Sequence, residues 1–164
     1  MIISNGIIGS LSEGYGGTKA LDFVEVPWSD AGKRRIRRNT IAGLDFALSM
    51  ERSQYLFHGA VLFSDDSRVI AVSRPEEPAL IIDLCQADQG MGNVRQAALI
   101  GHAFGNQHVP IEINETSIIV PMLSSEQLML KTVHDLKLGE VGLRFSHVRL
   151  GASEPLCMTS HSHD

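Results

Sequence analysis

Cysteine is scarce in this chain. Its 164 residues include only two cysteines, Cys85 and Cys157, which lie far apart and form no Cys-x-x-Cys pair. Zinc ribbons and thioredoxin-type redox sites need such closely spaced pairs, so both classes are excluded. We expect the two sulfurs to be free thiols, as is usual in a cytoplasmic protein.

Long apolar runs are also missing. Runs such as residues 79–82 are far shorter than the roughly 20 residues that a membrane-spanning helix requires. The first residues, Met-Ile-Ile-Ser-Asn, have neither the positive charge nor the long apolar segment of a signal peptide. We therefore expect a cytoplasmic protein with no membrane partner.

The chain has fewer basic residues than acidic residues. The chain has 14 Lys and Arg against 19 Asp and Glu, a formal net charge of -5, which argues against nucleic acid as the main partner. The exception is residues 33–38, Lys-Arg-Arg-Ile-Arg-Arg. This segment could be a docking patch for an acidic partner, or a solvated edge strand that its charges protect from aggregation. Because the basic residues are so local, we favour the edge strand.

The sequence also has no pattern typical of an enzyme. It contains no phosphate-binding P-loop, and it shows no activated nucleophile and no pair of carboxylates in a catalytic context. A small hydrolase that used His108 or His102 as a base would need a phosphate-cradling loop or a positioned Arg and Asn. Asn106 is present, but no glycine-rich phosphate loop precedes it. We therefore expect a protein that is not an enzyme.

The patterns that are present predict two domains of an α+β protein. Residues 1–75 read as short strands separated by turns such as 64–67, which indicates an all-β domain. The segment Pro75-Glu76-Glu77-Pro78 is the predicted boundary, and its two glutamates fit a solvated linker better than acid–base or metal-binding groups. We expect a second domain over 76–150 and a mobile tail over 151–164.

The second domain has a regular order of predicted elements. We expect strands at 79–84, 108–113, 118–120 and 140–150, and helices at 91–104 and from Ser124 to Gly139. Gly105 is the expected C′ residue that stops the first helix, and Ser124 with Gln127 fits a capping box at the second. The buried stripe expected on the first helix consists of Val94, Ala97, Ala98, Gly101 and Phe104. The order β-α-β-β-α-β predicts a ferredoxin-like domain.

His108 is the candidate metal ligand among seven histidines. It is out of phase with the apolar residues Val109, Ile111 and Ile113, so we expect its imidazole to point outward. One imidazole cannot hold a metal well, so further ligands must come from a symmetric dimer or from the tail. The tail offers His161 and His163, and Cys157 as a soft ligand, although two tail histidines could equally occur by chance.

The segment around His108 resembles a known family. Its residues Gly105-Asn106-Gln107-His108-Val109-Pro110 are similar to the Gly-Asn-Arg-His-x-Pro signature of the UreE family, and the likeness in organisation covers nearly the whole chain. The resemblance implies a nickel metallochaperone. Such a protein is a homodimer joined through its C-terminal domains, where two copies of His108 bind Ni(II) and the tail residues His161 and His163 complete the site. The implied partners are the urease accessory GTPase and the apo-urease complex. The resemblance also implies that the N-terminal domain, residues 1–75, binds peptides or partner proteins.

The chain departs from the family pattern in three places. Gln107 replaces the usual arginine, residues 116–120 contain no histidine, and the tail is short. A short tail suggests delivery of nickel, not storage, and zinc or copper could also occupy such a site in vitro. The alternative function is a protein- or peptide-binding co-chaperone module without specific metal binding. Whether Cys157 or His102 contributes a ligand stays open.

Overall fold

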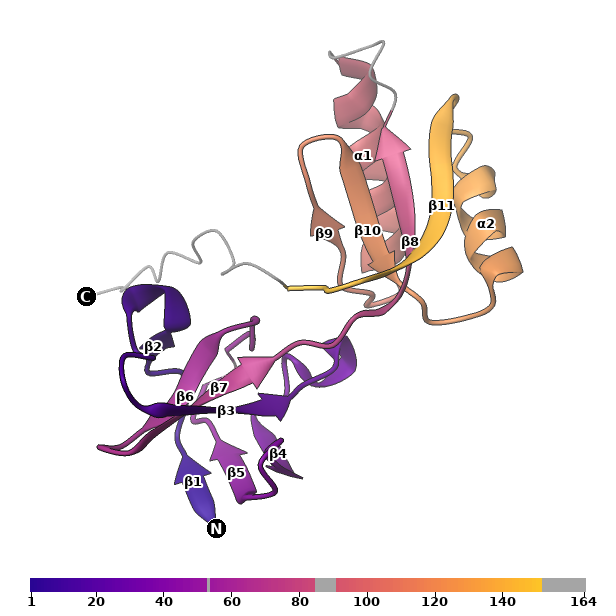
Figure 1. Cartoon of the computed structure of the whole chain (residues 1–164). Coiled ribbons are helices and arrows are strands. Elements are labelled where there is room, and N and C mark those ends of the chain that lie inside the picture. The colour runs from indigo at the N-terminus through magenta and orange to yellow at the C-terminus, as the bar shows by residue number, and fades with distance from the viewer. Residues whose placement is uncertain (53, 85–90, 152–164) are drawn as a thin grey trace, which may run out of the picture. The chain divides into compact units, whose positions relative to one another are not determined.

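The computed structural model describes residues 1–52, 54–84 and 91–151. The described chain forms two compact units (Figure 1). The first unit holds Met1–Pro75 together with Gly151, and the second unit holds Glu76–Leu150. The elements confirm the predicted α+β class, with β-sheets in the first unit and helices joined to a sheet in the second.

The first unit contains two sheets. The four-stranded sheet has the order β2 (Gly9–Ser10), β6 (Ala60–Ser64), β7 (Arg68–Ser73) and β3 (Ala20–Glu25). The three-stranded sheet has the order β1 (Ile2–Ser4), β5 (Asp45–Ser49) and β4 (Arg35–Asn39). Two short 3-10 helices, η1 (Leu11–Glu13) and η2 (Trp28–Asp30), lie in the connections.

Alternate residues of both sheets form one apolar core. Phe46 and Leu48 of β5 cluster with Leu62 of β6 and with Ile70 and Val72 of β7, and all five are at most 2% exposed. Burial of side chains of this size stabilises a fold by roughly 1.5–3 kcal/mol each before the entropy cost of ordering the chain. The period-two pattern of the sequence therefore reflects which face of each strand the core covers.

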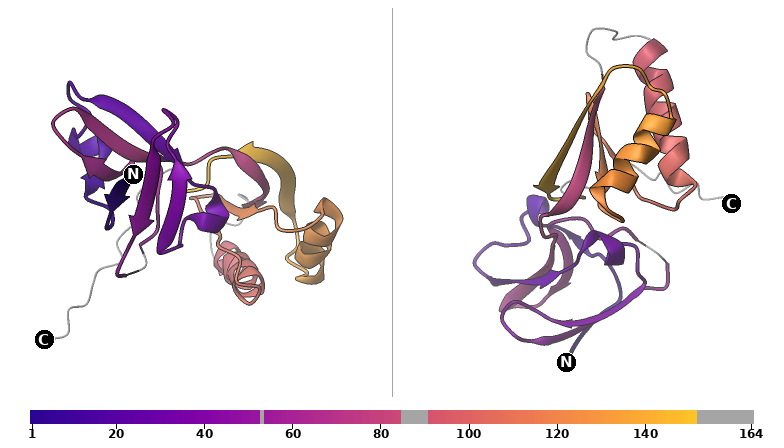
Figure 2. Two further views of the ribbon diagram at one scale, coloured as in Figure 1. Left: turned by 90° about the horizontal axis from the view of Figure 1, so that it is seen from below. Right: turned by 90° about the vertical axis from the view of Figure 1, so that its right-hand side faces the viewer.

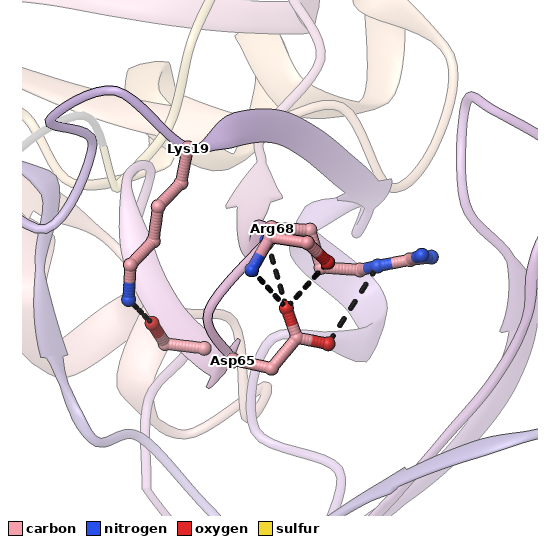
Figure 3. Close-up of polar contacts among 5 residues, drawn as sticks. Lys19, Asp65 and Arg68 are labelled. Atoms are coloured by element: carbon pink, nitrogen blue, oxygen red, sulfur yellow. Dashed lines mark hydrogen bonds and ion pairs between the residues drawn. The ribbon is translucent and has the colours of Figure 1, made fainter.

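The hairpin between β6 and β7 is closed by Asp65 (Figure 3). Its carboxylate accepts hydrogen bonds of 2.8 Å from the backbone N–H groups of Ser67 and Arg68 and from the Ser67 hydroxyl. The hydrogen bond from the Ser67 backbone is the main reason that the pKa of Asp65 lies below its ordinary value. Beside the turn, the Lys19 ammonium donates to the Ser64 hydroxyl at 3.0 Å. The predicted turn over 64–67 is confirmed.

The second unit is an antiparallel sheet with both helices on one face (Figure 2). The strand order is β11 (Val141–Val148), β8 (Glu77–Leu84), β10 (Ser117–Pro121) and β9 (Glu112–Ile113). The helices are α1 (Met91–Gly105), between β8 and β9, and α2 (Glu126–Asp135), between β10 and β11. This order confirms the ferredoxin-like prediction.

Some details of the helices differ from the prediction. Val94 is 62% exposed, and Ile100, which was not predicted as a core residue, is fully buried. Periodicity shows which side of a helix is apolar, but it does not show where along its length the helix meets the sheet. The N-cap of α2 is Ser125 and not Ser124, because the Ser125 hydroxyl is the one that accepts the N–H of Leu128.

Candidate metal centre

His108 lies in the turn that closes helix α1. The backbone N–H of Val109 donates to the carbonyl of Phe104 at 3.0 Å, and the N–H of His108 donates to the carbonyl of Gly105 at 2.9 Å. These two bonds define a Schellman motif, in which the residue before the last donor adopts a left-handed conformation. His108 has that conformation, with a φ of 56°.

The expectation that Gly105 is the C′ residue of the helix is therefore wrong, although the helix does end there. Gly105 is the last residue of α1, and the left-handed position falls three residues later, on His108. A left-handed residue with a side chain costs about 1–2 kcal/mol relative to the right-handed conformation, which is why glycine usually occupies this place. The cost is offset because Phe104 and Val109, on either side of the turn, are 3% and 5% exposed in the same core.

The strand predicted over 108–113 is shorter in the structure. Strand β9 spans only Glu112–Ile113, so His108 belongs to the turn and not to a strand. Pro110 has no backbone N–H to give to a sheet ladder, which explains why the pairing starts late. The His108 side chain is exposed as predicted. The reason is the geometry of the turn, and not the alternation of inward and outward side chains along a strand.

The C-terminal end of α1 gives His108 a surrounding that favours cations. The carbonyl groups at the end of a helix carry a partial negative charge that attracts positive ions. Residues 102–110 contain no Lys or Arg. Gln107, at the position where the signature has arginine, instead donates from its side chain to the carbonyl of Ala103 at 3.3 Å. A metal cation at His108 would therefore meet no fixed positive charge from this segment.

His102 contacts Asn106 on the same exposed surface. The Asn106 amide nitrogen lies 3.0 Å from Nε2 of His102. An amide nitrogen can only donate, so this contact requires Nε2 of His102 to accept. The contact occupies Nε2, which supports a structural role for His102.

The described residues do not test whether His108 meets the other predicted ligands. His161, His163 and Cys157 lie outside the described residues. Within the described part of the chain, no group of three or more His, Cys, Asp or Glu side chains is close enough to hold a metal ion. His134 at the end of α2 and His147 on β11 are both exposed. At this turn the described chain therefore supplies one exposed imidazole on a backbone that the Schellman motif fixes.

Comparisons with known proteins fit this arrangement. A family model described as the N-terminal domain of the UreE urease accessory protein matches residues 7–73. The urease accessory protein UreE of Lysinibacillus sphaericus is 28% identical over 88% of this chain and 88% of its own length. UreE of Staphylococcus epidermidis is 26% identical over 89% of this chain and 87% of its own length, and UreE of Edwardsiella ictaluri is 29% identical over 85% and 62%. The chain is thus similar to UreE proteins over most of its length, and residues 7–73 match the family model of their N-terminal domain.

The similarity to UreE proteins indicates the broad class of function. The family consists of accessory chaperones in urease maturation, so the expectations of a chaperone role and of no enzymatic activity are confirmed. The family model covers only the first unit, and the likeness of the second unit comes from the UreE relatives. No helix in the described ranges is both long and apolar enough to cross a membrane.

Proposed function

We propose that this protein is a cytoplasmic nickel metallochaperone. Two copies of His108 hold one Ni(II) on the axis of a homodimer, and the tail residues His161 and His163 complete the site. The complex then transfers nickel to apo-urease through the accessory GTPase. The observation that carries this proposal is the conformation of His108, an exposed imidazole kept at a position where glycine would be more stable.

A dimer is the simplest way to complete the site. Imidazole is a good ligand for nickel, but a useful site needs more than one. In a two-fold symmetric dimer the same residue of each chain meets at the axis, so one exposed histidine per chain becomes a pair. The Schellman turn fixes the backbone of each His108, so little conformational entropy is lost when a metal joins the two rings.

A site of this kind suits a carrier. Ligands that come from separate segments can leave the metal one at a time, so a receiving protein can replace them stepwise. Imidazole must be neutral to coordinate a metal, so nickel affinity should decrease in acid. The donor set does not by itself select nickel, since zinc and copper also bind imidazole.

Calorimetric titration with nickel tests the proposal. The wild-type protein should bind about one nickel ion tightly per two chains, because the site lies on the symmetry axis. His108→Ala should abolish this tight binding. His134→Ala removes another exposed histidine, at the end of α2, and should leave the binding unchanged. The double variant of His161 and His163 to alanine should weaken the binding.

Two results would contradict the nickel site. One is unchanged tight binding by His108→Ala. The other is one nickel ion per chain in a protein that light scattering shows to be a monomer. The competing function, a co-chaperone module without specific metal binding, predicts no stoichiometric nickel binding by the wild type, so the same titration separates the two functions.

A further inference from the structure

Arg74 carries a buried charge without a counter-ion among the described residues. It comes directly after strand β7, at the end of the first unit, and its side chain is 0% exposed. None of the ion pairs between described residues includes it. An arginine is almost never fully buried unless it is paired, because an unpaired charge in the interior loses its hydration without compensation.

One side of the Arg74 guanidinium is held by residues 55–58. Nη1 donates to the carbonyl of Leu56 at 3.1 Å, and the guanidinium carbon lies 5.5 Å from the centre of the Tyr55 ring. The backbone N–H of Arg74 donates to Nδ1 of His58 at 3.2 Å. These contacts fix the position of the group, but a carbonyl oxygen and an aromatic ring do not replace a negative charge.

The other edge of the guanidinium has no hydrogen-bond partner among the described residues. Nε and Nη2 of Arg74 are both buried, and neither donates to a described group. The N–H bonds on this edge point in the same direction and match the two oxygens of a carboxylate. Arg37 uses the same two nitrogens to bind both oxygens of Asp45, at 3.1 and 3.0 Å. The unpaired edge of Arg74 therefore has the form of a carboxylate site.

Gly151 brings the end of the chain next to Arg74. A Cβ atom at Gly151 would lie 3.1 Å from Nη1 of Arg74, and the carbonyl of Gly151 accepts the N–H of His58 at 2.9 Å. Residues 152–164 contain two acidic side chains, Glu154 and Asp164. Three residues of chain span up to roughly 10 Å, so Glu154 can reach the guanidinium while Gly151 keeps its contacts.

We propose that Nε and Nη2 of Arg74 bind the carboxylate of Glu154, and that this ion pair attaches the start of the tail to the first unit. The pair would neutralise the buried charge and satisfy both unpaired donors. His161 would then lie seven residues from a fixed point, and so no more than about 25 Å from it. The proposal depends on the contacts of Arg74 and not on the nickel site, so its test uses no metal.

Urea unfolding followed by Trp28 fluorescence tests the ion pair, because the single tryptophan lies in the first unit. Glu154→Gln keeps the size of the side chain and removes its charge, so it should lower the urea midpoint by about 1–2 M. The matched control is Asp164→Asn, which also removes one carboxylate from the tail and should unfold at the wild-type midpoint.

A double-mutant cycle with Arg74→Met separates a direct pair from two independent effects. Each single variant leaves a charge without its partner, whereas the double variant removes both charges. The shift of the double variant should therefore be smaller than the sum of the two single shifts. Shifts that add would contradict the proposal.

The NMR signal of the Arg74 Nε–H group gives a direct measurement that needs no Arg74 variant. In the wild type this proton should exchange slowly with water, because it is buried and donates to a carboxylate. In Glu154→Gln the signal should shift and exchange faster, and in Asp164→Asn it should stay unchanged.

Three results would show that Glu154 is not the partner of Arg74. One is an unchanged urea midpoint in Glu154→Gln. The second is an unchanged Arg74 Nε–H signal in that variant, which would mean that a solvent anion or water occupies the edge. The third is an equal loss of stability in Asp164→Asn, which would assign the effect to the general charge of the tail.

Discussion

At the scale of single residues, His108 combines a cost in stability with a proposed role in binding. Its left-handed backbone is one that glycine adopts without strain. We expect His108→Gly to raise the free energy of unfolding of the second unit by about 1 kcal/mol, whereas His108→Ala keeps the strain and changes it little. Both variants should lose tight nickel binding. Urea unfolding followed by helical circular dichroism reports this unit, since α1 and α2 both lie in it.

Lys137 provides a matched control for this prediction. It follows α2 and also has a left-handed backbone, with a φ of 50°. Lys137→Gly should stabilise the second unit as His108→Gly does, but it should leave nickel binding intact. If His108→Gly were destabilising while Lys137→Gly was stabilising, the His108 side chain would contribute to the stability of the second unit. The claim that His108 lowers this stability through its left-handed backbone would then be wrong.

At the scale of elements, Asp30 ties the short helix η2 to strand β4. It is 9% exposed, and its hydrogen bond from Lys33 is the largest cause that lowers its pKa, with further contributions from Arg38. A carboxyl whose pKa is lowered by folding adds stability above its ordinary pKa and loses it as the pH falls through the lowered value. Asp30→Asn should therefore cost about 1–3 kcal/mol at neutral pH. The difference from wild type should shrink in strong acid.

The fluorescence of Trp28 can measure this effect. Trp28 is the only tryptophan of the chain and begins η2, so it reports on the first unit. Urea unfolding of wild type and Asp30→Asn at neutral and at strongly acidic pH gives the comparison. Asp66→Asn, an exposed residue of the β6–β7 turn, is the control and should have little effect at either pH. A difference for Asp30→Asn that did not change with pH would show that the ion pairs are not its source.

The elements also show how far the sequence predicted the structure. The order of strands and helices followed from hydrophobic periodicity, and the edge position of β4 followed from its charge, because both patterns reflect which faces contact water. The conformation of His108 did not follow, since Gly105 lies close by and glycine is the usual left-handed residue. Its place depends on the burial of Phe104 and Val109 together, which is a tertiary contact. Whether His161 and His163 reach His108 remains a prediction.

At the scale of the whole molecule, the chain passes between the two units twice. It crosses once after Pro75 and again after Leu150. The first crossing leads into the start of β8 and the second leaves from the end of β11. These two strand ends lie side by side, because Glu77 of β8 pairs with Val148 of β11. The second crossing ends on the first unit, where the carbonyl of Gly151 accepts the N–H of His58 at 2.9 Å. The tail with its two histidines therefore continues from the first unit, while His108 belongs to the second.

Gly151 is the residue on which this attachment depends. It has a φ of 65°, and a Cβ atom there would lie 3.0 Å from Cε1 of Tyr55 and 3.1 Å from Nη1 of Arg74, which is fully buried. A β-branched residue would combine backbone strain with this crowding, so Gly151→Val should destabilise the first unit by about 1–3 kcal/mol. Trp28 fluorescence should then shift to lower urea, while the helical circular dichroism of the second unit should not. Equal shifts of both signals would mean that the two units unfold together. Unchanged signals would mean that the second crossing is not anchored at Gly151.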